Sequence, residues 1–280
     1  MRCLLKTGDP EKVVFFANVS RDRESFIMAG NFLQTLGWGD NRERDSGNDN
    51  GTVSGKDGGK TPGAKDYTKN IVSFYTKAKA FGHLAGFHEG NAESEIDEFR
   101  DYDKALVHLE LALAVRVKEA GVTTVSGETT GATTDAKTDE KTGDKSDDKT
   151  GETTPNPLVD RVNLLERSIT HVKRFRACRV SLRDASRKKK TVAEIFALAD
   201  DVAALEKASA EGGHKIHPPP SLRVGDLFAM LVEHAYGVDK DAAAAFGYLE
   251  TMKARGIQIV HFVDDDLTRD IARDVGKECV

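Results

Sequence analysis

The sequence is poor in the features that mark secreted, disulfide-rich or membrane-spanning proteins. It has three cysteines, Cys3, Cys178 and Cys279, which are scattered and form no C-x-x-C pair. This number and spacing favour reduced thiols in the cytosol over a disulfide or zinc framework. The N-terminal apolar run is far too short for a signal peptide, and no stretch reaches the length of a membrane span. We therefore expect a cytosolic protein without a transmembrane segment.

The sequence also lacks an excess of positive charge. With 41 Lys and Arg against 46 Asp and Glu, its net charge is −5, and its pI is about 5.9. A protein of this balance is not expected to bind nucleic acid as a whole. Its 280 residues are enough for a well-buried core and for more than one domain.

Recognisable catalytic or ligand-binding motifs are missing. Gly59-Lys60-Thr61 lacks the upstream glycine of a phosphate-binding loop, because Ser54 occupies that position. Asp264-Asp265-Asp266 favours a helix cap over a cation site. No helical His pair has metal-ligand spacing, and we interpret the eight histidines as surface or satisfied core residues: His83, His88, His108, His171, His214, His217, His234 and His261. We predict no catalytic, cofactor-binding or metal-binding residue, although a catalytic triad could not be recognised by local spacing.

What the sequence does contain is apolar residues at helical spacing, most clearly between Asp66 and Ala114. Three successive stripes predict three helices in this region. The first stripe comprises Tyr67, Ile71, Phe74, Tyr75, Ala78 and Phe81. The second comprises Leu84, Phe87, Ala92 and Ile96, and the third Tyr102, Ala105, Leu106, Leu109, Ala112 and Leu113.

A small–large–small pattern within the third stripe is typical of the second helix of a tetratricopeptide repeat, where small residues let helices approach closely. It occurs at Ala105, Leu109 and Ala112 and again at Ala245, Leu249 and Met252. We expect these six residues, together with Phe74, Tyr75 and Tyr102, to pack the repeats. The predicted fold is all-α, a tetratricopeptide-like solenoid of helical hairpins.

Start and stop signals place further helices along the chain. Asp9-Pro10 begins one helix, Gly37 ends the next, and a stripe from Leu158 to Cys178 forms a long one. Thr191 and Glu194 predict a capping box that opens another helix. Helices through Val224–Ala235 and 242–252 follow, with Gly256 as the C-terminal stop. Residues 257–263 fit either a short strand or an extended packed segment, and Asp264–266 caps a final helix.

Two polar segments interrupt the helical pattern. Residues 39–65 and 121–156 are rich in Gly, Asp, Lys, Ser and Thr and nearly devoid of apolar side chains. Such sequences bury too little surface to offset the entropy of ordering, so we predict disordered insertions. The expected organisation is a repeat start at 1–38 whose first helix is cut short, repeats at 66–120, and repeats with a C-terminal helix at 157–280.

One charged stretch is a candidate docking surface. Ten basic residues and a single acid lie between Arg167 and Lys190, and an acidic counterpart runs from Glu89 to Asp103. The residues expected to dock an acidic partner or an anionic lipid are Arg174, Arg176, Arg179, Lys188, Lys189 and Lys190. The alternatives are a solvated helix face with a basic loop, or pairing within the solenoid.

Several sequence blocks together carry a family resemblance. They include Val13-Val-Phe-Phe-Ala-Asn-Val-Ser-Arg, Glu95-Ile-Asp-Glu-Phe-Arg-Asp-Tyr-Asp-Lys-Ala-Leu and Val224-Gly-Asp-Leu-Phe-Ala-Met-Leu-Val-Glu-His, with shorter blocks at 26–34, 69–78, 84–87 and 173–175. In this order they resemble the C-terminal tetratricopeptide-like region of the intraflagellar transport protein 140 family. Members of that family begin with WD-repeat propellers, which are absent here, so we expect the sequence to be a piece of a longer protein.

The resemblance implies a non-enzymatic scaffold of intraflagellar transport complex A that supports retrograde transport and cilium assembly. Implied partners are the other subunits of that complex and adaptors for ciliary membrane-protein cargo, with no nucleic acid. The implied location is the cytoplasm and the cilium or flagellum, at the axoneme and basal body. Two alternatives remain: a cytosolic repeat adaptor of a vesicle-coat or chaperone system, and an enzyme hidden in the helical array.

Overall fold

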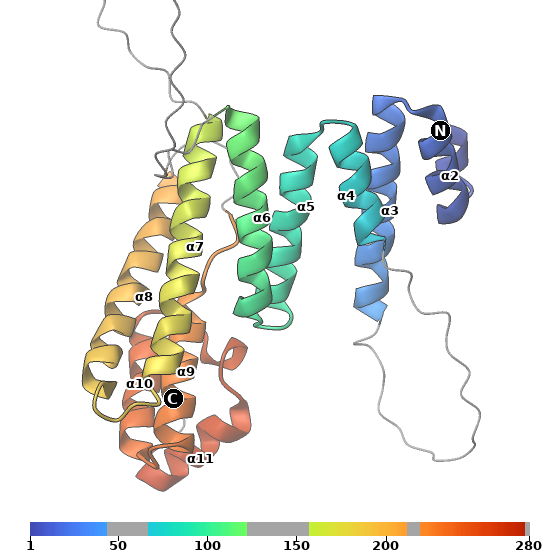
Figure 1. Ribbon diagram of the computed structural model, residues 1–280. Helices are drawn as coiled ribbons and strands as arrows, with labels where there is room; N and C mark the ends of the chain where they lie inside the picture. Colours follow the sequence, from blue (N-terminus) through green and yellow to red (C-terminus); the bar gives the residue numbers. More distant parts are fainter. Residues whose placement is uncertain (44–66, 122–156, 212–218, 278–280) are drawn as a thin grey trace, which may run out of the picture.

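The computed structural model describes residues 1–43, 67–121, 157–211 and 219–277, which form an array of packed helices without a β-strand (Figure 1). The helices are α1 (Arg2–Leu5), α2 (Pro10–Ser20), α3 (Arg23–Glu43), α4 (Thr68–Lys77), α5 (Phe81–Asp97), α6 (Tyr102–Ala120), α7 (Pro157–Ser181), α8 (Lys188–Glu211), α9 (Val224–Gly237), α10 (Ala242–Ala254), the 3₁₀ helix η1 (Ile259–His261) and α11 (Asp265–Val275). The prediction of an all-α helical solenoid is confirmed for these residues. Nearly all of the predicted insertions at 39–65 and 121–156 lie outside them.

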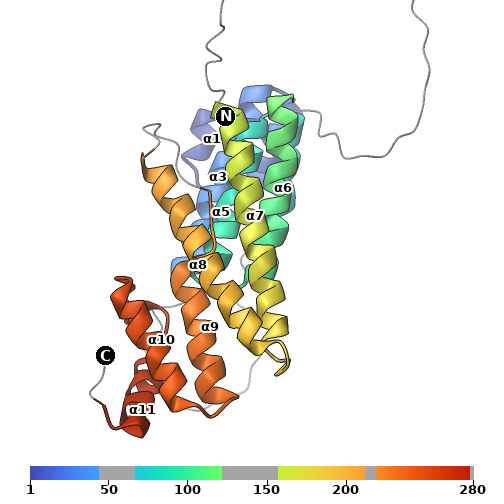
Figure 2. The same cartoon turned by 90° about the vertical axis from the view of Figure 1, so that its left-hand side faces the viewer.

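Successive helices stand side by side along the array. The chain starts with α1 and α2 at one end, and its C-terminal helices α9, α10 and α11 lie together at the other (Figures 1 and 2). Each helix packs chiefly on its neighbours in sequence, as expected for stacked helical hairpins.

A recurring turn joins the helices of this array. In the described part of the chain, the non-glycine residues with positive φ are Arg21, Lys79, Arg100 and Lys240, all basic. Each lies two positions before the first residue of a helix. The residue between this position and the helix is Asp22, Ala80, Asp101 and Asp241, respectively. The three aspartates accept a hydrogen bond from a backbone N–H of the first turn, at 2.9–3.0 Å. The left-handed residue reverses the chain and the aspartate caps the next helix.

The N-terminal apolar cluster lies between α2, α3, α4 and α5. Tyr75 is fully buried at its centre, and its hydroxyl contacts the side-chain oxygens of Asn31 at 2.8 Å and Gln34 at 3.1 Å. Burial raises the pKa of the Tyr75 phenol to about 12. Gly30 lies against this ring so closely that a Cβ there would stand 2.6 Å from a ring carbon.

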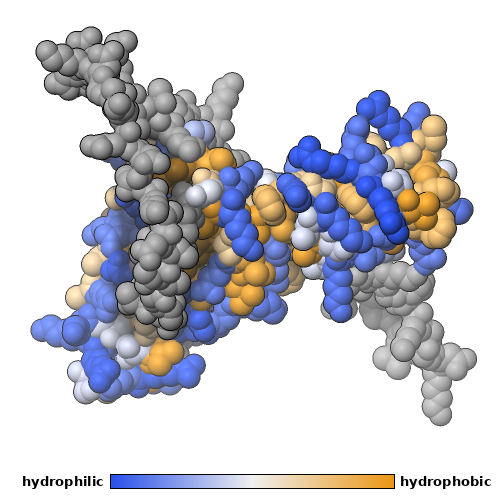
Figure 3. All heavy atoms as spheres, turned by 45° about the horizontal axis from the view of Figure 1, so that its top comes forward, coloured by the Kyte–Doolittle hydropathy of each residue, from blue (hydrophilic) through white to orange (hydrophobic). Residues whose placement is uncertain are grey.

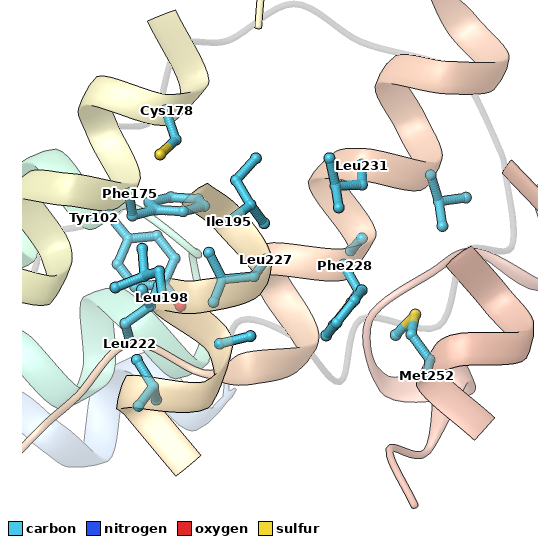
Figure 4. Packing of buried hydrophobic residues seen from close by; sticks show 14 of the residues in the cluster. Tyr102, Phe175, Cys178, Ile195, Leu198, Leu222, Leu227, Phe228, Leu231 and Met252 are labelled. Carbon is cyan, nitrogen blue, oxygen red and sulfur yellow. The ribbon is translucent and has the colours of Figure 1, made fainter. Parts of the chain in front are cut away.

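A larger cluster fills the space between α5 and α11. The rings of Tyr102 and Phe175 are tilted by 60° to each other, with their centroids 4.8 Å apart, beside Ile195, Leu198 and Leu227 (Figure 4). Phe228, Leu231 and Met252 continue this cluster toward α10. Helix α5 belongs to both clusters, because Leu84 and Phe87 face the N-terminal one and Ala92 and Ile96 the larger one.

Several expected helix limits differ from the structure. Helix α3 continues past Gly37 to Glu43, so the predicted boundary at residue 38 cuts a helix. The first stripe divides, since α4 ends at Lys77 and Phe81 begins α5. The expected capping box is wrong: α8 begins at Lys188, and the Thr191 hydroxyl donates to the Arg187 carbonyl at 3.1 Å instead of capping. Residues 259–261 form a 3₁₀ helix and no strand.

Other predicted helix starts, stops and apolar stripes agree with the structure. Asp9 accepts hydrogen bonds from the first turn of α2, with Pro10 at the first helical position. Asp264 caps α11 in the same way, and Gly256 follows the end of α10 with φ of +74°. The predicted stripe from Leu158 to Cys178 lies within the single helix α7.

Candidate functional site

The residues expected to pack the repeats all lie in the interior. Phe74 and Tyr75 belong to the N-terminal cluster, and Ala112 is fully buried in α6. The other six belong to the larger cluster: Tyr102, Ala105, Leu109, Ala245, Leu249 and Met252. The two triplets with the small–large–small pattern occupy α6 and α10, each the second helix of a hairpin. These side chains therefore pack the helices together. The candidates for contact are the polar groups between the helices.

A buried polar junction ties the α5–α6 hairpin to α9. The Tyr102 hydroxyl donates to Asp226 Oδ2 at 2.5 Å, and Arg223 Nε donates to the same oxygen at 2.8 Å. Arg100 Nε lies 3.6 Å from the other oxygen, Oδ1. Burial, and then the neighbouring Asp226 charge, raises the pKa of the Tyr102 phenol, so it stays a donor. The sequence identified Tyr102 as an apolar packing residue, and nothing in it indicated Asp226 as the partner.

The same junction extends to the segment before α11. The guanidinium groups of Arg100 and Arg223 lie 5.9 and 5.4 Å from the centroid of the Phe262 ring. Arg100 Nη1 also donates to the Phe262 carbonyl at 2.7 Å. Two arginines from different hairpins thus hold the C-terminal turn in place through stacking and a hydrogen bond.

A second buried ionic group lies between α5, α6 and α7. The Glu89 carboxylate forms ion pairs with Arg116 Nε at 3.1 Å and with Arg161 Nη2. Arg116 Nη1 also pairs with Glu119 at 2.9 Å. Glu89 is only 6% exposed, so its charge is kept in the interior by these two arginines. Glu89 begins the acidic run noted in the sequence, and it pairs within the array, as the alternative of pairing within the solenoid predicts.

The basic stretch is largely paired within the protein. Arg174 contacts Asp201 at 2.6 Å, Arg179 contacts Asp103 at 3.3 Å, and Arg176 also pairs with Asp103. Lys188 pairs with Asp239. Four of the six predicted docking residues therefore join neighbouring helices, as the alternative of pairing within the solenoid proposed. Lys189 and Lys190 are exposed, and no carboxylate of the described residues pairs with them.

The histidines and acidic runs do not assemble into a metal site in the described part of the chain. His88 and His108 stack across α5 and α6, with ring centroids 5.9 Å apart. Burial lowers the pKa of His88 to about 4, with a smaller contribution from His108. His214, His217 and Gly59-Lys60-Thr61 lie outside the described residues.

Two family models match the chain. The TPR domain shared by intraflagellar transport proteins 140 and 172 matches residues 1–44, which contain α1 to α3. The C-terminal TPR domain of intraflagellar transport protein 140 matches residues 82–139, which contain nearly all of α5 and the whole of α6. The chain is intraflagellar transport protein 140-like. The second match includes the junction residues Tyr102 and Arg100 and the buried acid Glu89.

The two matches to this intraflagellar transport protein 140-like chain indicate a protein-interaction scaffold related to intraflagellar transport. TPR domains act as scaffolds, and their stacked helices present extended surfaces to other proteins. None of the described helices is long and apolar enough to cross a bilayer. The ionic groups described above join neighbouring helices of the array and so maintain the shape of that surface.

Proposed function

We propose that the chain is a non-enzymatic scaffold subunit of the ciliary intraflagellar transport complex A. In this role it supports retrograde intraflagellar transport and cilium assembly through protein–protein contacts. The observation that carries the proposal is the pair of matches to TPR domains of the intraflagellar transport protein 140 type, at residues 1–44 and 82–139. The burial of both small–large–small triplets supports it, because it gives α6 and α10 the packing of repeat helices.

The partners that we propose are the other subunits of complex A and adaptors for ciliary membrane-protein cargo. The chain would act in the cytoplasm and in the cilium, along the axoneme and near the basal body. These assignments follow from the family alone, since fold does not identify a partner.

Co-purification from ciliated cells tests the scaffold role. An affinity-tagged chain is expected to recover complex A subunits, in comparison with the tag alone. Recovery of vesicle-coat or chaperone components in their place would contradict the proposal and support the cytosolic adaptor. A clean preparation without complex A subunits would equally contradict it.

Within this role, the basic stretch is proposed to dock an acidic partner through Lys189 and Lys190. Arg174, Arg176, Arg179 and Lys188 remain part of the proposed surface, but their reversal would also break ion pairs between helices. The sharper test therefore reverses Lys189 and Lys190 to Glu. Capture of the partner should fall while far-UV circular dichroism stays unchanged, and a control that reverses exposed Lys240 and Lys253 should keep capture. Equal capture by both variants would disprove docking here.

A further inference from the structure

A hollow of about 490 Å³ opens where three helix ends meet. Arg23 and Ile27 line it from the start of α3, Lys79 and the first turn of α5 from the α4–α5 turn, and Glu119 from the end of α6. These ends lie along one edge of the array, at the top of Figure 1. On the face containing this edge, hydrophilic and hydrophobic side chains lie side by side over the middle of the array (Figure 3).

The hollow has unneutralised positive charge. Arg23 Nε donates to the Ala78 carbonyl at 3.0 Å, which fixes the guanidinium at the rim and leaves its other N–H groups available. Within the described residues, no carboxylate forms an ion pair with Arg23 or with Lys79. Glu119 is the acid that lines the hollow, and it is already paired with Arg116 at 2.9 Å. The two cations therefore lack the counter-charge that most basic side chains of α7 have.

The backbone of the hollow adds to this charge. Helix α5 begins there with Ala80 at its N-cap, and no side chain caps its first turn. The other recurring turns have an aspartate at this position. A carboxylate already fits against the turn, because Glu119 Oε1 lies 2.9 Å from where a Cβ of Gly82 would stand. The hollow thus has an uncapped helix N-terminus beside Glu119 at one side, and Arg23 and Lys79 line the rest of it.

The hollow also has an apolar wall. Ile27 and Phe81 line it and are each only partly covered by the rest of the protein. A ligand that combines carboxylates with an apolar side chain would match both surfaces. We propose that this hollow binds an acidic segment of a partner protein, whose carboxylates contact Arg23 and Lys79 and whose apolar side chain covers Ile27 and Phe81. The partner's identity rests on the proposed scaffold function, but binding at this site does not.

Peptide binding to the purified full chain tests the site. The probe is a short fluorescein-labelled peptide of aspartate, glutamate and leucine, and its binding is followed by fluorescence anisotropy. Replacing its acids by asparagine and glutamine should abolish binding, and added salt should weaken it. The variant Arg23→Glu with Lys79→Glu should raise the Kd by about tenfold or more, because both charge-assisted contacts become repulsive.

The matched control reverses Lys240 and Lys253. Lys240 occupies the same left-handed turn position as Lys79, and the control changes the net charge by the same amount. Its Kd should stay within about twofold of the unaltered chain. Because Arg23 also holds the Ala78 carbonyl, the neutral variant Arg23→Gln with Lys79→Gln is measured too, with thermal melts of every variant. Loss of binding in this folded neutral variant supports the site.

Other outcomes would overturn the proposal. They are equal binding of the acidic and neutral peptides, equal weakening by the control, and unchanged binding in both Arg23–Lys79 variants. Binding of a phosphoserine version of the peptide about tenfold more tightly would replace the carboxylate assignment by a phosphate one. If the peptide binds as expected but the tagged chain recovers no complex A subunit, the scaffold function fails and the site stands.

Discussion

Tyr102 and Asp226 lie 124 positions apart in the chain, and a 2.5 Å hydrogen bond joins them in the interior. Replacing Tyr102 by Phe removes the donor and keeps the ring that packs on Phe175. We expect Tyr102→Phe to lower the free energy of unfolding by about 1–2 kcal/mol, because a buried charge-assisted bond is lost while Arg223 still pairs with Asp226. Urea denaturation followed by circular dichroism measures this change.

The surface bond between Tyr236 and Asp274 provides the control. Its length is 2.8 Å and it is exposed, so Tyr236→Phe should cost less than about 0.5 kcal/mol. A cost for Tyr102→Phe no larger than that of the control would show that the junction does not stabilise the array.

Because the His88 imidazole is buried, we expect the protein to lose stability in acid. Burial lowers its pKa in the folded state to about 4, whereas the unfolded chain has the ordinary value near 6.5. Between these two values the unfolded state binds more protons, so the free energy of unfolding falls as pH falls from 6.5 toward 4. His88 alone contributes up to about 1.4 kcal/mol per pH unit in this range.

The variant His88→Leu should flatten this pH dependence in denaturation curves recorded from pH 7 to pH 4. His108 and His171 also have lowered pKa values because of burial, so part of the slope will remain. The exposed His261 is the control, and His261→Leu should keep the original slope. Identical slopes in the His88 and His261 variants would contradict the assignment.

Replacing either of two helical glycines by alanine should change the stability of the protein, in opposite directions at the two positions. A Cβ added at Gly30 would stand 2.6 Å from a carbon of the rigid Tyr75 ring, so Gly30→Ala should destabilise the protein by about 1–3 kcal/mol. At Gly86, no atom lies within 4 Å of the corresponding position, and Gly86→Ala should stabilise by about 0.5–1 kcal/mol. Thermal melts of the two variants test the pair, and a shift of the same sign in both would refute it.

The left-handed turn residues offer a further test. Lys240 has φ of +58° and is exposed, so Lys240→Gly should relieve backbone strain and raise the free energy of unfolding by about 0.5–1 kcal/mol. The same substitution at Lys253, in the last turn of α10, should lower it by up to about 1 kcal/mol. If both glycine variants lose stability equally, the strain at Lys240 is not significant.

Local sequence signals were sufficient to predict the helices and the apolar interior. Asp9-Pro10 and Asp264 determine helix starts within a few residues, and the spacing of Tyr102, Ala105 and Leu109 identifies a buried face without any tertiary information. The predicted limits of α3 and α8 are wrong because a single glycine or an isolated capping box does not by itself determine where a helix ends or begins. Gly37 is followed by six more helical residues, and Thr191 is buried where its hydroxyl bonds to Arg187.

The polar contacts could not have been predicted in the same way. Arg176 and Asp103 lie 73 positions apart in the chain, and their ion pair depends on how α6 and α7 stack. In sequence, a paired arginine and a free one look alike. The difference between Arg174, which has Asp201 as its partner, and Lys189, which has none among the described residues, appears only once the helices are assembled.

Helix α5 contributes side chains to both apolar clusters, which has a consequence for how the molecule comes apart. Melting of the N-terminal cluster would strip Leu84 and Phe87 of their neighbours, and melting of the larger one would do the same to Ala92 and Ile96. A helix cannot easily stay folded over one half alone, so the two halves should unfold cooperatively. In hydrogen exchange, the central amides of α5 should open only with the whole molecule, whereas those of α1 should exchange first.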